Sequence, residues 1–317
     1  MAVPRPGMSG AIHARLADGR WHFQHGPIDC IVMAEGEAAV VAGCLERAWR
    51  RFEGVLDELV AELPLLRTDL ASAQGARLRP TGPIARRMVE ACRPHAAGGR
   101  FITAMAAVAG SVAEELIAAF ADPRIRRAFV NNGGDIALHL VPGASFDVGL
   151  FTDPANGLAQ RPLDGRFRID AASPVRGIAT SGWRGRSLSL GIADSVTVLA
   201  ANASAADAAA TVVANAVDVA APGILRRPAF EVRGDSDLGD RLVTCDVAPL
   251  PIAQIEHALG NGAATARGEI ARGRIIAAAL SLQGRFAFAD AADAAGRAVN
   301  PARPPRVDQT PRSPSPC

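Results

Sequence analysis

The chain has 317 residues, and its apolar content of 49% is ample for a sizeable core, which excludes a disordered or fibrous protein. Its 34 basic and 32 acidic side chains nearly cancel, so charge does not point to nucleic acid or an anionic membrane as a partner. A small-molecule ligand is the better expectation.

The N-terminal region and the cysteines indicate a cytoplasmic protein. Residues 1–23 lack a continuous apolar segment after Arg5, and no later stretch is apolar over the roughly 18 residues that span a bilayer. The five cysteines are scattered, with no C-x-x-C spacing that would hold zinc or a redox pair. We therefore expect no membrane partner and reduced thiols.

In the first part of the chain, the apolar spacing changes between strand and helix patterns. Residues 21–35 predict a strand or hairpin, and residues 37–62 predict one long amphipathic helix that ends before a proline. A second helix is predicted at 83–92, with a proline in its first turn. A third, very apolar helix is predicted at 104–120 and belongs in the core.

Short strands dominate the predictions for the rest of the chain. Residues 126–141 predict a strand, a tight glycine turn and another strand. One further helix is expected at 203–220. Further strands are expected at 146–151, 167–169, 188–192, 195–200, 275–279 and 286–289.

These elements predict an α+β fold with an antiparallel or mixed sheet covered by helices, because strands and helices do not alternate as in a doubly wound fold. We expect a single domain over residues 1–290. The Pro-, Arg- and Ser-rich residues 291–317 are predicted to form a disordered tail. The alanine-rich helices leave room for a homodimer interface.

The segment Ala206-Asp207-Ala-Ala-Ala-Thr211 is the first candidate site. A helical spacing of four places the carboxylate and the hydroxyl on one face, where both oxygens could bind a hard cation such as Mg²⁺. The alternative is a capping box that begins at Ser204, in which Asp207 only closes the N-terminus of its own helix. On spacing alone, the capping box is favoured.

Two glycine-containing segments are candidate anion sites. Residues 131–135 include Asn132, Gly133, Gly134 and Asp135, and the two glycines can expose backbone N–H groups to an anion beside an acidic side chain. An ordinary hairpin turn explains the same residues and is favoured on spacing alone.

The second segment is the small-residue loop Thr180-Ser181-Gly182, followed by Arg186, whose hydroxyls and guanidinium could bind phosphate. Loops of this composition are common. The sequence contains no hydrolase, zinc-protease or Walker motif, and it singles out no catalytic residue.

The order of five blocks carries a resemblance to a known superfamily. The blocks M-A-A-V-A-G, N-G-G-D-I, I-A-T-S-G, S-V-T-V and A-D-A-A-A-T follow one another between residues 105 and 211. In this order they resemble the ApbE superfamily of flavin transferases. Several blocks resemble more closely a separate branch of bacterial and archaeal proteins without an assigned function.

The resemblance implies an α+β sandwich that binds a flavin, FAD or FMN, beside Mg²⁺, and an activity that transfers FMN to a threonine of a partner protein with release of AMP. It implies that Asp207 and Thr211 bind the metal together with a backbone carbonyl near Ala107. It also implies that residues 132–135 line the ligand cleft and that Thr180, Ser181 and Gly182 face the flavin or its phosphates.

The chain departs from the transferase pattern after the T-S-G loop. The transferases carry H-I-I-D-P there, whereas this chain has G-R-S-L-S-L-G at residues 185–191. The transferases also carry an A-I-A-K-G segment, and its lysine has no counterpart in the M-A-A-V-A-G block of this chain. Three hypotheses therefore stay open: an FMN transferase or FAD pyrophosphatase, a non-catalytic binding protein that kept the fold, and an enzyme that uses the cleft for another metabolite.

Overall fold

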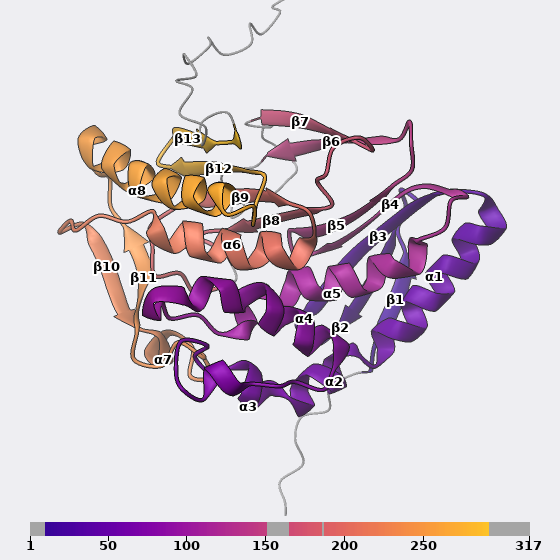
Figure 1. The fold of residues 1–317 in the computed structure, drawn as a ribbon, viewed down its shortest axis with the longest axis horizontal. Helices are drawn as coiled ribbons and strands as arrows, with labels where there is room; N and C mark the ends of the chain where they lie inside the picture. The colour runs from indigo at the N-terminus through magenta and orange to yellow at the C-terminus, as the bar shows by residue number, and fades with distance from the viewer. Residues whose placement is uncertain (1–9, 151–164, 186, 292–317) are drawn as a thin grey trace, which may run out of the picture.

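The computed structural model describes residues 10–150, 165–185 and 187–291. Their main feature is a nine-stranded sheet in which every neighbouring pair is antiparallel (Figure 1). In spatial order its strands are β1 (Ile12–Arg15), β2 (Trp21–His25), β3 (Ile28–Gly36), β4 (Ile125–Asn132), β5 (Asp135–Leu140), β8 (Gly177–Ser181), β9 (Ser195–Ala200), β12 (Ala277–Leu282) and β13 (Arg285–Ala289).

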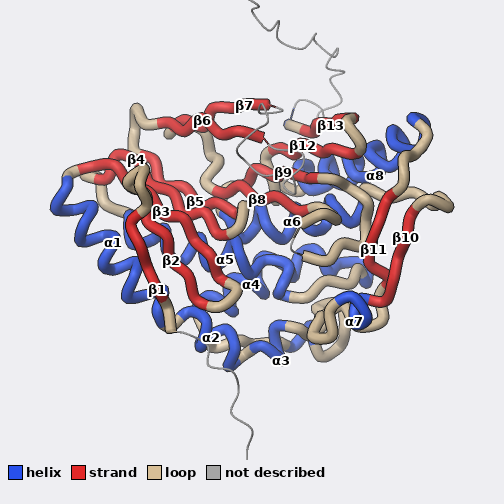
Figure 2. The backbone as a smooth tube through the Cα atoms, turned by 180° about the vertical axis from the view of Figure 1, so that it is seen from behind, coloured by secondary structure: helices blue, strands red, loops and turns tan. Residues whose placement is uncertain are grey.

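Helices cover one face of this sheet. Figure 2, seen from behind, shows the strands in front of the helices. Two short hairpins lie at the margins of the sheet, β6 (Ser145–Leu150) with β7 (Gly165–Asp170) and β10 (Ile224–Pro228) with β11 (Leu242–Val247). The helices are α1 (Ala38–Glu53), α2 (Val55–Ala61), α3 (Leu63–Leu66), α4 (Pro83–Cys92), α5 (Val108–Ile117), α6 (Ala203–Ala216), α7 (Ala229–Val232) and α8 (Ile252–Ala271).

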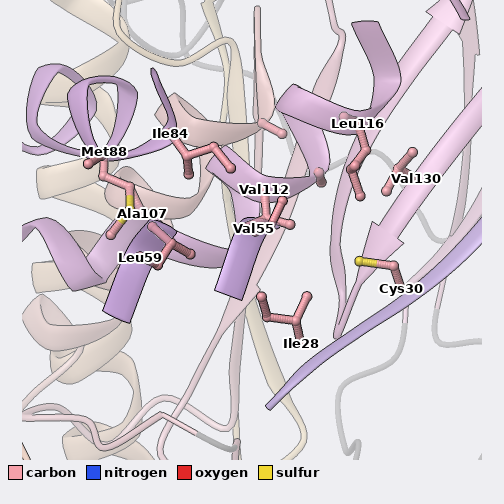
Figure 3. Packing of buried hydrophobic residues seen from close by; sticks show 14 of the residues in the cluster. Ile28, Cys30, Val55, Leu59, Ile84, Met88, Ala107, Val112, Leu116 and Val130 are labelled. Carbon is pink, nitrogen blue, oxygen red and sulfur yellow. The ribbon is translucent and has the colours of Figure 1, made fainter. Parts of the chain in front are cut away.

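Apolar side chains fill the space between the sheet and the helices. One cluster joins the inner face of β3 and β4 to α1, α2, α4 and α5, and includes Cys30, Val130 and Leu116 (Figure 3). A second cluster packs α6 and α8 on β9 and β12. A smaller one lies on the other face, where Phe146 and Ile169 of the β6–β7 hairpin meet residues of β5 and β8. This layering confirms the predicted α+β class.

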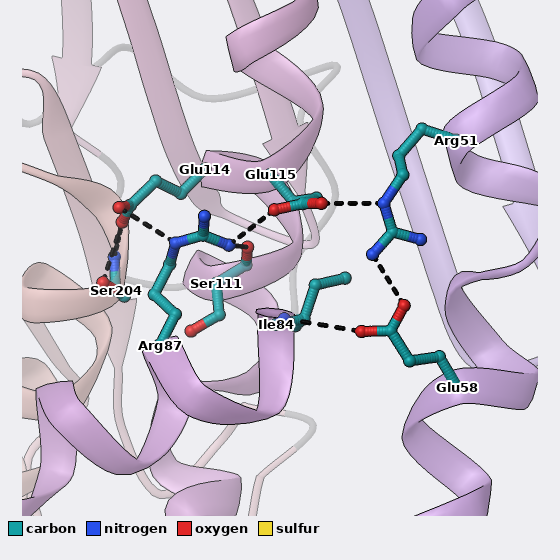
Figure 4. Close-up of polar contacts among 8 residues, drawn as sticks. All are labelled: Arg51, Glu58, Ile84, Arg87, Ser111, Glu114, Glu115 and Ser204. Carbon is teal, nitrogen blue, oxygen red and sulfur yellow. Dashed lines mark hydrogen bonds and ion pairs between the residues drawn. The ribbon is translucent and has the colours of Figure 1, made fainter. Parts of the chain in front are cut away.

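A half-buried ion network ties the helices together. The Arg51 guanidinium of α1 bridges Glu58 of α2 and Glu115 of α5, at 2.7 Å each. Arg87 of α4 contacts Glu115 at 2.9 Å and Glu114 at 3.2 Å (Figure 4). Because Glu58, Glu114 and Glu115 each have an arginine partner, this half-buried network can stay charged with reduced access to water.

Several predicted elements are confirmed. Helix α4 and strand β9 have the predicted bounds, and residues 21–35 form the β2–β3 hairpin. The hairpin around residues 126–141 is β4–β5, and its two turn residues, Gly133 and Gly134, have φ of 67° and 114°. Only glycine adopts this pair of conformations without strain.

Two predictions were wrong. The helix expected at 37–62 is split into α1 and α2 at Gly54, and glycine is among the weakest helix formers in a helix interior. The strand expected at 188–192 is irregular: Leu190 N–H bonds to Asn215 of α6 and Ile192 N–H to the Val217 carbonyl, so these donors do not pair with a strand.

The twenty-residue helix α8 had no predicted counterpart. Its sequence contains Gly260, Gly262 and Gly268, which lower helix propensity. Packing explains at least one of them: a Cβ on Gly262 would lie 2.3 Å from Cγ2 of Val217. The predicted tail lies outside the described residues after its first residue. In the described part of the chain, no helix is long and apolar enough to cross a membrane.

Candidate functional site

Asp207 lies where α6 meets the first turn of α5. Its Oδ2 accepts a hydrogen bond of 2.8 Å from the Gly110 backbone N–H. A Cβ on Gly110 would lie 2.3 Å from the Ala203 carbonyl oxygen and 2.8 Å from Cβ of Asp207. The glycine of the M-A-A-V-A-G block is therefore what lets α5 approach the A-D-A-A-A-T helix closely enough for this bond.

The capping-box alternative for Asp207 is wrong. The N-cap of α6 is Asn202, whose side-chain oxygen accepts the Ala205 N–H at 2.9 Å. The Ser204 N–H is taken by Glu114 of α5 at 3.1 Å. Asp207 lies about one turn after the N-cap. It accepts a hydrogen bond from α5 and does not cap the N-terminus of α6.

The carboxylate of Asp135 affects the pKa of Asp207. Burial first, and then repulsion from Asp135, raises the pKa of Asp207 well above its ordinary value, although the backbone N–H groups of Gly110 and Ala109 oppose this. Asp135 begins β5 and accepts the Thr180 backbone N–H at 3.2 Å. The fold thus places two acids from two predicted motifs close enough to disfavour simultaneous ionisation.

The Asn132 side chain attaches the β4–β5 hairpin, which carries Asp135, to α5. Its amide nitrogen donates to the Ala109 carbonyl at 3.2 Å, and its oxygen accepts the Asp29 N–H at 3.4 Å. The side chain is only 4% exposed. Within the turn, Asn131 accepts the Gly134 N–H at 2.8 Å. The N-G-G-D segment therefore forms the hairpin turn that was the alternative to an anion site. Its Asn132 also links the hairpin that carries Asp135 to the start of α5.

A cavity of about 900 Å³ opens beside this group. Asn132 and Thr211, from two of the predicted blocks, both contribute to its wall. Thr211 lies one helical turn after Asp207 on the same face of α6, as predicted. Apolar side chains from α2 and α5, among them Leu59 and Val112 (Figure 3), line one side. The volume is typical of a site for a small molecule or cofactor.

The T-S-G loop is not part of this wall. Thr180 pairs with Thr197 in the sheet, and their hydroxyl oxygens lie 2.9 Å apart. Its neighbour Ala179 belongs to the core beneath the helices, so alternation along β8 places Thr180 on the face away from Asp207. The cavity is lined by Ser187, Leu188 and Leu190, farther along, and by none of Thr180, Ser181 and Gly182.

Asp194 and Gly182 hold the T-S-G loop in place. A Cβ on Gly182 would lie 2.3 Å from the Asp194 carbonyl oxygen. The Asp194 carboxylate accepts from Trp183 at 3.3 Å, pairs with Arg184 at 3.3 Å, and accepts the Gln283 N–H at 2.5 Å. This carboxylate anchors the loop to the turn between β12 and β13.

Sequence patterns gave no sign of another part of the cavity wall. It is formed by Arg67, by residues 100–103 and by residues of the loop 233–238. The Thr103 hydroxyl hydrogen-bonds Asp237, and Arg67 pairs with Asp235 at 3.3 Å. These residues lie more than a hundred positions apart in the chain, so no local spacing could have connected them.

The donors predicted from the sequence are of the types that a hard cation binds. A carboxylate, the Thr211 hydroxyl and a backbone oxygen near Ala107, which directly precedes α5, are ligand types that Mg²⁺ prefers. A cation would also offset the repulsion that raises the Asp207 pKa. Within the described residues, no group of three or more His, Cys, Asp or Glu side chains could hold a metal ion, so a site here would need the hydroxyl and backbone oxygens.

Replacing Gly110 with alanine should test the close approach of α5 and α6. The added methyl would meet backbone atoms that cannot move aside, so we expect a loss of about 1–3 kcal/mol in the free energy of unfolding. Urea denaturation would measure it. As a control, Gly260→Ala on α8 adds a methyl where nothing lies within 4 Å, and it should leave stability unchanged or raise it.

The chain is similar to several proteins that carry the name UPF0280. The UPF0280 protein of Methanopyrus kandleri is 33% identical over 187 residues, which are 59% of this chain and 69% of the relative. That of Methanosphaerula palustris is 38% identical over 125 residues, 38% of this chain and 49% of the relative. The second relative is thus matched over about half of its length.

Two solved structures are similar at low identity. The flavinyl transferase ApbE of Pseudomonas stutzeri, in its apo form, is 14% identical, with 92% of this chain and 97% of that chain covered at a TM-score of 0.37. The flavin transferase ApbE of Vibrio cholerae is also 14% identical, with 90% and 99% covered at a TM-score of 0.34. The family model described as "AbpE bacteria" matches residues 13–288, most of the chain, and the protein therefore belongs to this ApbE-like family.

Proposed function

We propose that the protein binds a flavin or a related nucleotide together with Mg²⁺ and acts on its phosphoanhydride, as an FMN transferase or an FAD pyrophosphatase. The observation that supports the proposal is a cavity of about 900 Å³ whose wall includes Thr211 and Asn132, with Asp207 one helical turn before Thr211 and hydrogen-bonded to Gly110 of α5. Membership of an ApbE-like family supports a flavin as the ligand class of this proposal.

In this proposal Asp207 and Thr211 hold Mg²⁺, with a backbone oxygen near Ala107 as a further donor. When bound, the cation would stabilise the negative charge that develops on the phosphoryl oxygens. Asp135 would contribute negative charge beside Asp207. Gly110 and Asn132 keep these groups in position through their hydrogen bonds.

The cavity walls suit the two chemical parts of a flavin nucleotide. Arg67 and Arg100 of the cavity wall present guanidinium groups, which recognise phosphate by paired hydrogen bonds. The apolar wall formed by Leu56, Leu59 and Val112 offers a surface for a planar ring system.

Incubation with FAD, in the presence of Mg²⁺ or EDTA, tests this function directly. Flavin fluorescence reports binding, and chromatography of the products reports FMN and AMP. We expect binding that needs Mg²⁺ and release of AMP. Absence of both flavin binding and AMP release would contradict the proposal and would favour a cleft used for a different metabolite, detectable as a shift in melting temperature.

The alternative function is a binding protein without turnover. It is favoured by the loop that follows T-S-G, where Asp194, the next acidic residue along the chain, is already bound by Trp183, Arg184 and Gln283. No H-I-I-D-P segment supplies another. Magnesium-dependent FAD binding with no AMP over a long incubation would support this alternative.

A further inference from the structure

Residues 229–241 connect β10 to β11 and form a strap along the cavity. Asp235 and Asp237 of the strap line the cavity. On α7, which is also part of the strap, Phe230 and Val232 are exposed to solvent. Figure 1 shows α7 at one end of the β10–β11 hairpin, near α3. Because the strap lines the cavity on one side and meets solvent on the other, its position decides how this part of the cavity is reached.

The backbone hydrogen bonds of the strap hold it together as one unit. The Ala229 N–H bonds to the Arg241 carbonyl at 2.9 Å, and the Phe230 N–H bonds to the Gly239 carbonyl at 3.1 Å. In the described part of the chain, no backbone bond joins the strap to another element. Apart from Ala229, its residues are exposed or half-buried. The strap could therefore move without breaking its own backbone bonds.

The base of the same hairpin is anchored. Val243 is fully buried, and the Thr244 N–H bonds to the Ser189 carbonyl at 2.9 Å. The Thr244 hydroxyl also donates to the Gly191 carbonyl at 2.8 Å. Movement is therefore expected at the strap and not in β11, so that the ends of the two strands act as the hinge.

Two side-chain contacts hold the strap against the segment that precedes residues 104–107. The Thr103 hydroxyl donates to the Asp237 carboxylate, and Thr103 is only 3% exposed, so this charge-assisted bond is sheltered from water. The Arg241 guanidinium lies 3.5 Å from the centre of the Phe101 ring, in cation–π contact. These two contacts are called the latch.

A further contact across the cavity wall is weaker than the latch. Arg67 pairs with Asp235 at 3.3 Å, but the aspartate side chain is 73% exposed, and an exposed ion pair contributes little. A segment with an exposed backbone and few buried apolar side chains opens far more often than the whole protein unfolds. The strap meets both conditions, so the latch decides how often it opens.

We propose that the strap opens and closes over this part of the cavity, and that the Thr103–Asp237 and Phe101–Arg241 contacts latch it shut. Closure shields the cavity from water, and opening admits a ligand. The device belongs to the cavity wall and not to one ligand. It therefore goes beyond the flavin proposal, and either can fail while the other holds.

Access of a thiol reagent to the cavity tests the strap without any ligand. Val112 lines the cavity and is 5% exposed, and Val112→Cys places a thiol of similar size there. The full chain with this change is incubated with N-ethylmaleimide, and mass spectrometry of its peptides gives the labelling rate at each cysteine. When closing is fast, the rate at a buried thiol follows the fraction of open molecules. We expect Arg241→Gln and Asp237→Asn each to raise the rate at position 112 about fivefold, the loss of one such contact.

The chain supplies two controls. The native Cys44 thiol is fully buried and lies outside the cavity wall, so its labelling rate should not change. Arg227→Gln removes a pair with Glu231, at 3.2 Å, that lies within the hairpin and its strap, and it should leave the rate at position 112 unchanged. If either latch variant left that rate unchanged, the proposal would be overturned. Equal acceleration at Cys44 would also overturn it, because the whole fold would then have loosened.

Discussion

Replacing Asp207 with asparagine is expected to abolish Mg²⁺-dependent flavin binding and to weaken flavin affinity in the presence of Mg²⁺ by roughly 100-fold or more. Asparagine keeps the size of the side chain and an oxygen that can accept the Gly110 N–H. It removes the negative charge on which a cation would depend. Flavin fluorescence titrations with Mg²⁺ and with EDTA would measure the change.

A matched control is Asp246→Asn, an exposed aspartate on β11 outside the cavity wall. It should bind flavin as the unmodified protein does. If Asp207→Asn retained Mg²⁺-dependent affinity, the metal assignment would be wrong. Urea denaturation would show that the variant is folded, so loss of binding could not be attributed to loss of structure.

The same carboxylate makes stability depend on pH in a predictable direction. Burial and Asp135 raise the pKa of Asp207 in the folded state, so the folded protein binds this proton more tightly than the unfolded chain does. The resulting stability is present below the ordinary aspartate pKa of about 3.9 and is lost as pH rises through the folded value. At neutral pH without metal, Asp207→Asn should therefore be at least as stable as the unmodified protein.

Replacing Glu115 with glutamine is expected to give the largest loss of stability outside the cavity. Glu115 is 16% exposed and receives both Arg51 and Arg87, so its removal leaves two guanidinium groups poorly paired between α1, α4 and α5 (Figure 4). Breaking a buried pair costs about 3–5 kcal/mol, and partial exposure reduces this to about 2 kcal/mol here. Urea denaturation at neutral pH would measure it.

The control for this variant is Glu46→Gln, whose pair with Arg50 is exposed and spans one turn of α1. It should cost only about 0.3–0.5 kcal/mol. Burial alone would raise the pKa of Glu115, but hydrogen bonds from Arg51 and Arg87 lower it overall. The stability that Glu115 contributes is therefore present above the ordinary glutamate pKa of about 4.3. It is lost as pH falls through the pKa of Glu115 in the folded protein. A Glu115→Gln deficit that stayed constant below that value would contradict this account.

Local patterns predicted the parts of the fold that local physics decides. The two glycines after Asn132 predicted a hairpin turn, and the proline at position 83 predicted the start of α4. The segment 188–192 was mistaken for a strand because its apolar alternation also suits an irregular segment bonded to α6. Helix α8 was missed because its three glycines lower helix propensity, and the close packing of Gly262 against Val217 and Leu280 is not visible in a sequence.

The candidate site was predictable only in part, for a similar reason. The order of the blocks selected Asp207, Thr211 and Asn132, which the fold brings to one region between α5, α6 and the β4–β5 turn. It could not show that β8 turns the Thr180 side chain to the other face of the sheet. Nor could it supply Arg100 or the loop 233–238, which meet at the cavity only through tertiary packing.

The short pairing of β5 with β8 is expected to make the sheet open more readily there than between its other central strands. Only two residue pairs join these strands, Ile136 with Ile178 and Ala137 with Gly177. They are supported by a bond from the Leu138 N–H to the Arg176 carbonyl and by one from the Thr180 N–H to the Asp135 side chain. The sheet strands that precede residue 141 in the sequence therefore meet those that follow residue 176 along a short β5–β8 pairing. We expect hydrogen exchange to be fastest there among the central strands, with α5 and α6 acting as the brace that limits its opening.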